Sequence, residues 1–198
     1  MANLGTGGAD LIKSHEGFSL KFYGDPVGYP TVGWGHLITD TKKYTKNTTG
    51  NPKDSLLTQA QADALSSSLN LGYTSPISQS KANTFFTEDT AKAVSAVNKL
   101  SLPTGMSLTQ SQFDALVSLT FNGGPGVLTT NDVKTMLAYK QIYSSFQGPR
   151  SKEENDNCSK LVSKAFSYDR NLQRRRNEEA NLFCKGMGYT HKYPVYTL

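Results

Sequence analysis

The segment EGFSLKFYGDPVGYPTVGWGH, residues 16–36, decides how we interpret this chain of 198 residues. A helix is expected over residues 9–16, and Gly17 is placed to stop it in a left-handed conformation. Apolar and β-branched residues then predict two short strands over residues 20–23 and 31–37, joined by a turn that contains Asp, Pro and Gly. The segment therefore predicts a helix followed by a small β-sheet.

Two carboxyl groups in this segment have contrasting surroundings. Glu16 falls on the last turn of the expected helix, where exposed carbonyl groups carry negative partial charge and favour the protonated acid. Asp25 lies in a solvated turn, where a carboxylate stays ionised. One protonated and one ionised carboxyl group form the pair that acid–base cleavage of a glycosidic bond requires.

The second strand supplies a third candidate residue. Side-chain alternation places Thr31 on one face with Gly33 and Gly35, and the bulkier residues on the other. The nearly bare face would let a large substrate approach the backbone while Thr31 holds a water molecule. His36 is interpreted as a supporting, hydrogen-bonding histidine rather than a catalytic one.

Each of these residues also has an ordinary structural interpretation, as a turn former, a surface acid or a strand residue. Their spacing is more specific, because Asp25 follows Glu16 by nine positions and Thr31 follows Asp25 by six. Together they resemble the phage-type lysozymes, the muramidases of glycoside hydrolase family 24. The stretches LTQSQFDALVSLTFNGG, residues 108–124, and LQRRRNEEANLF, residues 172–183, resemble the same family in the same order.

The resemblance implies a glycoside hydrolase, an N-acetylmuramidase that cleaves the β-1,4 bond between N-acetylmuramic acid and N-acetylglucosamine in peptidoglycan. It implies Glu16 as the general acid, Asp25 as the carboxylate that activates the nucleophile, and Thr31 as the residue that orients water. It further implies inversion at the anomeric carbon. Asn122 would bind sugar, and Arg175 would reach back toward the catalytic acid.

The expected architecture is a single lysozyme-like α+β domain over residues 1–198. It comprises a small N-terminal lobe with a short β-sheet (about 1–87), a connecting helix (about 88–100) capped by Thr87, and a larger all-helical lobe (about 101–198). Thr58 and Thr109 each open a capping box, with Gln61 and Gln112. The polar stretch at residues 39–55 is expected to be a long loop or an exposed hairpin, inserted relative to a minimal family member.

Composition limits the classes of partner. Lys and Arg total 21 against 16 Asp and Glu, giving a net charge of +5 and a pI near 9.1, which favours polyanionic partners such as wall polymers. No basic cluster is interleaved with aromatic residues, so nucleic acid is not expected as a partner. The apolar runs are too short for a membrane-spanning helix, so no stable membrane insertion is expected. No metal or cofactor site is expected, and Cys158 and Cys184 are either paired or free.

The biological setting stays open between a phage endolysin and a secreted antibacterial effector, both bacteriolytic. The N-terminus MANLGTGGADLIK has no secretory signal, so synthesis in the cytoplasm and action in the periplasm or cell wall are expected. An effector would imply a secretion machine and an immunity or inhibitor protein, and we expect a monomer. The alternative function is a non-catalytic peptidoglycan-binding module on a lysozyme fold.

Overall fold

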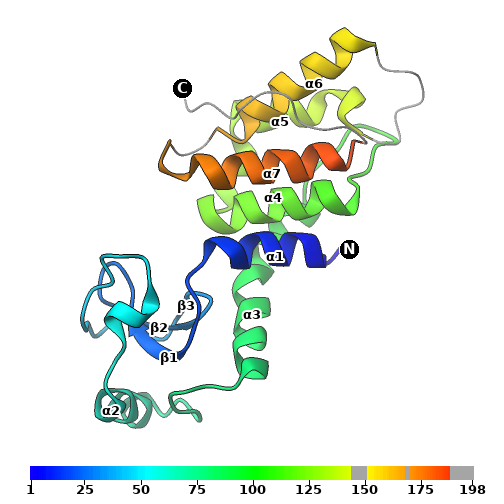
Figure 1. Ribbon diagram of the computed structural model, residues 1–198. Helices are drawn as coiled ribbons and strands as arrows, with labels where there is room; N and C mark the ends of the chain where they lie inside the picture. Colours follow the sequence, from blue (N-terminus) through cyan, green and yellow to red (C-terminus); the bar gives the residue numbers. More distant parts are fainter. Residues whose placement is uncertain (144–150, 168–169, 188–198) are drawn as a thin grey trace. The chain divides into compact units, whose positions relative to one another are not determined.

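The computed structural model describes residues 1–143, 151–167 and 170–187, and it has the predicted α+β class (Figure 1). Its described residues form a three-stranded antiparallel sheet near the N-terminus and seven α-helices. The chain divides into two compact units. One unit is residues 13–89; the other combines residues 1–12 with residues 90–198.

The sheet lies in the unit of residues 13–89 and has the order β1-β2-β3. Its strands are β1 (Ser19–Gly24), β2 (Pro30–Gly33) and β3 (His36–Leu37). Tyr23 of β1 lies opposite Thr31 of β2. The sheet therefore brings the turn after β1 next to the start of β2.

The single strand predicted over residues 31–37 is wrong. Gly33 and Gly35 have φ angles of 66° and 85°, left-handed values that turn the chain back on itself and split the segment into β2 and β3. The alternation of faces consequently stops at the turn. Gly33 faces the core, where an added Cβ would lie 3.6 Å from Ala82 Cβ, instead of sharing a face with Thr31.

The left-handed stop predicted at Gly17 is also wrong, because Gly17 lacks a positive φ. Helix α1 (Thr6–His15) ends one residue before Glu16. Glycine serves a different purpose at this position, since an added Cβ would lie 2.9 Å from Pro52 Cγ. The missing side chain lets the chain pass close to the short 3-10 helix η1 (Pro52–Ser55).

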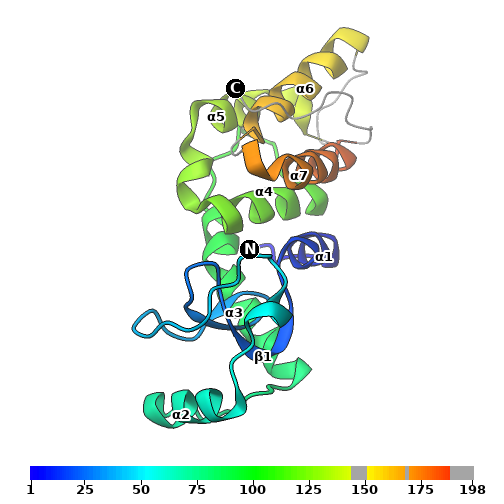
Figure 2. The ribbon, with the colours of Figure 1, turned by 60° about the vertical axis from the view of Figure 1, so that its left-hand side comes forward.

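Two helices complete the core under the sheet (Figures 1 and 2). They are α2 (Gln59–Leu69), which opens with the capping box expected at Thr58, and the first half of α3 (Gln79–Asn98). Phe22 and Val32 from the sheet pack into one apolar cluster with Leu65 and Phe85 from these helices. Each side chain is at most 5% exposed.

The helix cap predicted at Thr87 is wrong. Helix α3 begins at Gln79, after Ser78, whose hydroxyl accepts a hydrogen bond from Lys81 N. Thr87 lies inside the helix, and its hydroxyl donates to the carbonyl of Asn83. A threonine in mid-helix can satisfy its hydroxyl on the preceding turn, which is why the sequence pattern imitates a cap.

The other unit is helical. It contains α1 through Ile12, the second half of α3, and four helices: α4 (Gln110–Gly123), α5 (Asn131–Ala138), α6 (Lys152–Ala165) and α7 (Gln173–Lys185). Short 3-10 turns occur at η2 (Pro125–Thr129), η3 (Lys140–Ile142) and η4 (Arg170–Leu172). Helices α4 and α7 pack side by side (Figure 1).

Local contacts in the helical unit agree with its sequence. Helix α4 opens with the capping box expected at Thr109. The carboxylate of Asp114 on α4 accepts hydrogen bonds from Gly5 N and Gly8 N at the start of α1.

Cys158 and Cys184 are buried free thiols. No helix in the described ranges combines the length and the apolar character needed to cross a membrane.

The polar stretch after β3 is a loop that is paired with the turn between β1 and β2. Tyr44 N donates to Gly28 O at 2.7 Å, and Asn47 N donates to Asp25 O at 2.9 Å. The two chains approach so closely that a Cβ added at Gly24 would lie 1.9 Å from Thr45 O. The loop is thus fixed to the turn that carries Asp25 by backbone contacts.

The substitution Gly24→Ala tests this close approach. Its Cβ would collide with a backbone carbonyl, so we expect the free energy of unfolding to fall by roughly 1–3 kcal/mol or more. Chemical denaturation followed by circular dichroism measures the change. Gly126→Ala is the matched control, because an added Cβ there meets nothing within 4 Å. Equal stability of the two variants would contradict the packing of the loop against the turn.

Candidate active site

A pocket of about 330 Å³ in the unit of residues 13–89 brings three of the predicted residues together. Glu16, Asp25 and Thr31 all line it. They come from three different places: the residue that follows α1, the turn after β1, and strand β2. Asn122 and Arg175 belong to the other unit, so the roles expected for them stay predictions.

The turn after β1 holds the carboxylate of Asp25 in one orientation. Its Oδ1 accepts three backbone hydrogen bonds, from Val27 N at 2.8 Å, Gly28 N at 2.7 Å and Tyr29 N at 2.8 Å. Three hydrogen bonds from backbone N–H groups to one oxygen fix the rotamer of the side chain. Within the described part of the chain, Oδ2 makes no hydrogen bond, so it is available to a ligand or a water molecule.

Glu16 lies beside the tight turn between β2 and β3. A Cβ added at Gly35 would lie 3.8 Å from Glu16 Oε2, which places this carboxyl oxygen next to the glycine backbone. The side chain is half-buried and lines the pocket. The turn that splits the predicted strand therefore supplies the wall against which Glu16 lies.

Thr31 is only 3% exposed, yet it lines the pocket. Its hydroxyl donates a hydrogen bond to the carbonyl of Tyr29 at 3.1 Å. With the proton committed in this way, the lone pairs of Oγ1 remain to accept a hydrogen bond. Thr31 is therefore arranged as an acceptor for a water molecule in the pocket.

Tyr23 is a pocket residue that the sequence interpretation did not select. Burial raises its pKa to about 12, with further contributions in the same direction from the negative charges of Glu16 and Asp25; a hydrogen bond with the backbone of Gly35 acts in the opposite direction. The phenol is 5% exposed. It is consequently neutral over the physiological range and lies close enough to both carboxyl groups to sense their charge.

Other lining residues come from parts of the chain that carried no catalytic pattern. They are Leu37, Asp40, Asn47, Gly50 and Pro52. Asn47 is 5% exposed, and its Oδ1 accepts hydrogen bonds from the backbone of Thr49 and Gly50. The loop after β3 thus forms one wall of the pocket, a role that only its pairing with the Asp25 turn explains.

His36 does not line the pocket. Its Nδ1 lies 3.1 Å from both carboxylate oxygens of Asp89, and its ring stacks on Phe85 at 3.8 Å between centroids. These contacts join β3 to α3 within one unit. The supporting role expected for His36 stays a prediction, and this position agrees with it.

The phage lysozyme family model matches residues 13–179, a range that includes every residue lining this pocket. The chain belongs to the phage lysozyme family of glycoside hydrolases. It is 29% identical over 186 residues to the endolysin of Bacillus phage B103, covering 93% of this chain and 55% of that protein. It thus spans little more than half of that relative.

Two further relatives are matched over most of their length. The endolysin of Acyrthosiphon pisum secondary endosymbiont phage 1 is 29% identical over 174 residues, which cover 87% of this chain and 92% of that one. The endolysin of Salmonella phage P22 is 29% identical over 145 residues, covering 73% and 80%.

Solved structures of phage lysozymes have the same fold. The endolysin of Escherichia coli O157:H7 phage FAHEc1 aligns with a TM-score of 0.55 at 24% identity, covering 92% of this chain and 93% of that one. A mutant of P22 lysozyme aligns with a TM-score of 0.53 at 26% identity, covering 92% and 99%. Both likenesses support the lysozyme-like α+β fold.

The third stretch that resembles this family contains a buried ionic cluster in the helical unit. Glu179 on α7 accepts hydrogen bonds from Ser118 Oγ at 2.6 Å and from Arg175 Nε at 3.1 Å, and it pairs with Arg176 Nη1. Arg176 also donates through Nη2 to the side-chain oxygen of Asn122. Arg175 is 3% exposed, and Arg176 and Glu179 are fully buried.

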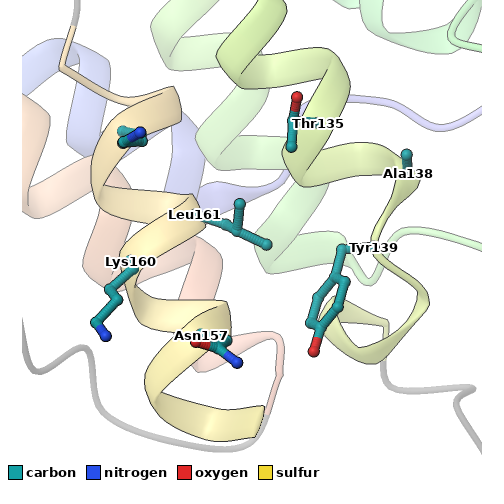
Figure 3. Close-up of a pocket in the computed structure, with 7 residues that line it drawn as sticks. Thr135, Ala138, Tyr139, Asn157, Lys160 and Leu161 are labelled. Carbon is teal, nitrogen blue, oxygen red and sulfur yellow. The ribbon is translucent and has the colours of Figure 1, made fainter. Parts of the chain in front are cut away.

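A larger cavity, of about 680 Å³, lies between α5 and α6 (Figure 3). Leu161 points from α6 toward α5, with Tyr139, Asn157 and Lys160 around it. None of the described residues that line it carries a carboxyl group. Size alone therefore does not identify the site, since the acid–base chemistry of a glycoside hydrolase needs two carboxyl groups.

Tyr23 makes stability depend on alkaline pH. Because its pKa rises from 10.0 to about 12 on folding, the folded protein holds the phenolic proton more tightly than the unfolded chain. This stabilisation is complete below pH 10 and is lost as the pH rises toward 12. The variant Tyr23→Phe has no phenol to ionise at this position. Between pH 10 and 12 its free energy of unfolding should therefore fall less than that of the wild type, by a difference of at most about 2–3 kcal/mol.

Urea denaturation at a series of alkaline pH values measures this effect, and the difference between the phenolate absorbance titrations of the wild type and Tyr23→Phe gives the pKa of Tyr23. Tyr143 is the comparison, because burial alone raises its pKa to about 12. Glu16→Gln should lower the pKa of Tyr23 and leave that of Tyr143 unchanged. Unchanged ionisation of both phenols would show that Tyr23 does not sense the Glu16 charge.

The buried cluster predicts unequal effects of two neighbouring substitutions. Glu179→Ala leaves two buried arginines without their shared carboxylate, so we expect the free energy of unfolding to fall by about 3–5 kcal/mol. Glu178→Ala should change it by less than about 0.5 kcal/mol, because its 3.8 Å pair with Arg174 joins side chains that are 41% and 76% exposed. Thermal denaturation of both variants measures the two changes. Equally small losses of stability would show that Glu179 lies on a solvated face of α7 and not in a buried ionic cluster.

Proposed function

We propose that this protein is a lysozyme that hydrolyses the β-1,4 bond between N-acetylmuramic acid and N-acetylglucosamine in peptidoglycan. One observation carries the proposal: Glu16, Asp25 and Thr31 line a single pocket in which one oxygen of Asp25 is held by three backbone N–H groups and the other is open. A binding module has no use for this arrangement. Membership of a glycoside hydrolase family agrees with it.

In the proposed reaction, Glu16 donates its proton to the glycosidic oxygen as the bond to the anomeric carbon breaks. A water molecule donates one hydrogen bond to Asp25 Oδ2 and one to Thr31 Oγ1, which directs its lone pair at the anomeric carbon. The water oxygen bonds to that carbon, and Asp25 takes up the proton that the water loses. Attack on the face opposite the leaving group inverts the configuration, so the new reducing end is the α-anomer.

Tyr23 and the second unit have secondary roles in this proposal. The phenol of Tyr23 stays neutral and so lines the pocket near the two carboxyl groups without adding a charge. For Asn122 and Arg175 we propose the roles that the family resemblance implies, sugar binding and support of the catalytic acid.

For the biological role we propose a phage endolysin that acts on the bacterial cell wall. The support is that the relatives named above are endolysins. A secreted effector with an immunity protein has no comparable support, and no observation favours it.

Glu16→Gln tests the acid. The amide is nearly the same size but cannot donate a proton to the leaving oxygen, so release of muropeptides from purified peptidoglycan should fall roughly 100- to 10,000-fold. Glu88→Gln, an exposed carboxyl group on α3 outside the pocket, is the matched control and should keep full activity. Proton NMR of the first product should show the α-anomer.

Two outcomes would overturn the proposal. Equal release by the wild type and Glu16→Gln would remove Glu16 from the role of acid. Binding of the wild type to insoluble peptidoglycan without release of any reducing ends would identify a non-catalytic module on a lysozyme fold.

A further inference from the structure

The loop over residues 39–51 carries three lysines at the edge of the catalytic pocket; we name it the lysine loop. We propose that its side chains Lys42, Lys43 and Lys46 bind carboxylates of the peptides attached to the glycan strand, so that the enzyme favours peptide-bearing peptidoglycan. This inference rests on the proposed function and names the substrate feature that the site selects.

The lysine loop is a built part of the pocket. Backbone hydrogen bonds of 2.7 Å and 2.9 Å tie Tyr44 and Asn47 to the turn that carries Asp25. Asp40 and Asn47 line the pocket itself. The Asn47 side chain is buried and closes the end of the loop by accepting from Gly50 N at 2.9 Å. Because the loop is anchored at both of these points, its backbone holds the three lysines beside the turn that carries Asp25.

The stems of Lys43 and Lys46 lie on the same turn. A Cβ added at Gly28 would meet Lys46 Cγ at 3.5 Å and Lys43 Cβ at 3.7 Å. The ammonium group of Lys43 lies 4.8 Å from the ring centroid of Tyr29, and Tyr29 lines the pocket. Lys42 Nζ lies 5.4 Å from the ring of Tyr44. The contact with Tyr29 keeps the charged end of Lys43 near the pocket, and the contact with Tyr44 holds Lys42 on the loop itself.

These charges are available to a ligand. Among the residues that the structure describes, none of the three ammonium groups forms an ion pair with a carboxylate. All three side chains are exposed. Besides Glu16, which holds the proton in the proposed reaction, the neighbouring pocket is lined by the carboxylates of Asp25 and Asp40, which would repel an anionic substrate. The lysines offset that repulsion on the side from which the loop borders the pocket.

The substrate has matching anions at the right place. In peptidoglycan the peptide is attached to the lactyl group of N-acetylmuramic acid, one of the two sugars joined by the cleaved bond, and it carries free carboxylates. A glycan bound for cleavage therefore has carboxylates close to the pocket at every site of reaction. Phosphates of other wall polymers lack this fixed relation to the bond, so we assign the lysine loop to the peptide carboxylates.

The test compares one polymer in two charge states. The substrate is peptidoglycan sacculi free of phosphate-containing wall polymers, either native or with the carboxylates converted to carboxamides by carbodiimide and ammonium. The triple variant Lys42→Gln, Lys43→Gln, Lys46→Gln is compared with the wild type. A control triple variant, Lys92→Gln, Lys99→Gln, Lys134→Gln, removes the same charge from exposed positions in the other unit.

On native sacculi we expect the lysine-loop variant to have an apparent KM roughly 5- to 20-fold higher, the combined effect of three exposed charge pairs, with kcat unchanged. On amidated sacculi the wild type should lose the same factor, and the two proteins should become equal. The control triple variant should behave as the wild type on both. Thermal denaturation confirms that each variant is folded.

Three results would overturn the inference. An equal effect of the control triple variant would show that net charge, not the lysine loop, is responsible. A difference that persists on amidated sacculi would assign the lysines to another part of the substrate. An unchanged apparent KM of the lysine-loop variant on the native, phosphate-free sacculi would show that the lysines do not bind peptide carboxylates. Failure of the proposed function itself is distinguished by Glu16→Gln retaining activity on either substrate.

Discussion

The site depends on one interaction, the capture of Asp25 Oδ1 by three consecutive backbone N–H groups of its own turn. A carboxylate on a flexible turn would sample many rotamers, and general base catalysis requires one. Here the turn itself supplies the donors, so the carboxylate is oriented as soon as residues 25–29 fold. The second oxygen is then directed by covalent geometry, at no further entropic cost.

The rest of the unit of residues 13–89 is arranged around that turn. Strand pairing puts Thr31 next to it, and the β2–β3 turn provides the backbone against which Glu16 lies. The lysine loop closes the opposite side through hydrogen bonds to the backbone of Gly28 and Asp25. Buried Tyr23 fills the space near both carboxyl groups and stays neutral because burial and those charges raise its pKa.

Much of this arrangement is predictable from sequence because it is local. Glu16, Asp25 and Thr31 lie within sixteen consecutive residues, and their spacing identifies both the α+β fold and the candidate acid–base pair. The capping boxes at Thr58 and Thr109 are equally local and are present. The errors have local causes as well. The sequence does not reveal the positive φ angles of Gly33 and Gly35, so its pattern predicts both residues in one continuous strand. Thr87 precedes two acidic residues as a helix cap does, but its hydroxyl bonds to the preceding turn inside a helix.

What sequence reasoning misses depends on contacts distant along the chain. Nothing in the pattern around Asn47 indicates that it lines a pocket with Glu16, because a loop is placed by what it pairs with and not by its own composition. Tyr23 looks like a core residue of a strand, which it is, and its proximity to the charges of Glu16 and Asp25 follows from the fold alone. The Glu179 cluster likewise needs α4 and α7 to be packed before its partners can be named.

The lysine loop is attached to the Asp25 turn through main-chain atoms, which has a consequence for the evolution of the enzyme. Amide and carbonyl groups are common to all residues, so mutations in the loop can exchange one side chain for another while the attachment survives. Catalytic activity and substrate preference are therefore separable traits here. Substitutions in the loop, whether selected on a different bacterial wall or introduced by design, can change the edge of the pocket without disturbing the catalytic groups inside it.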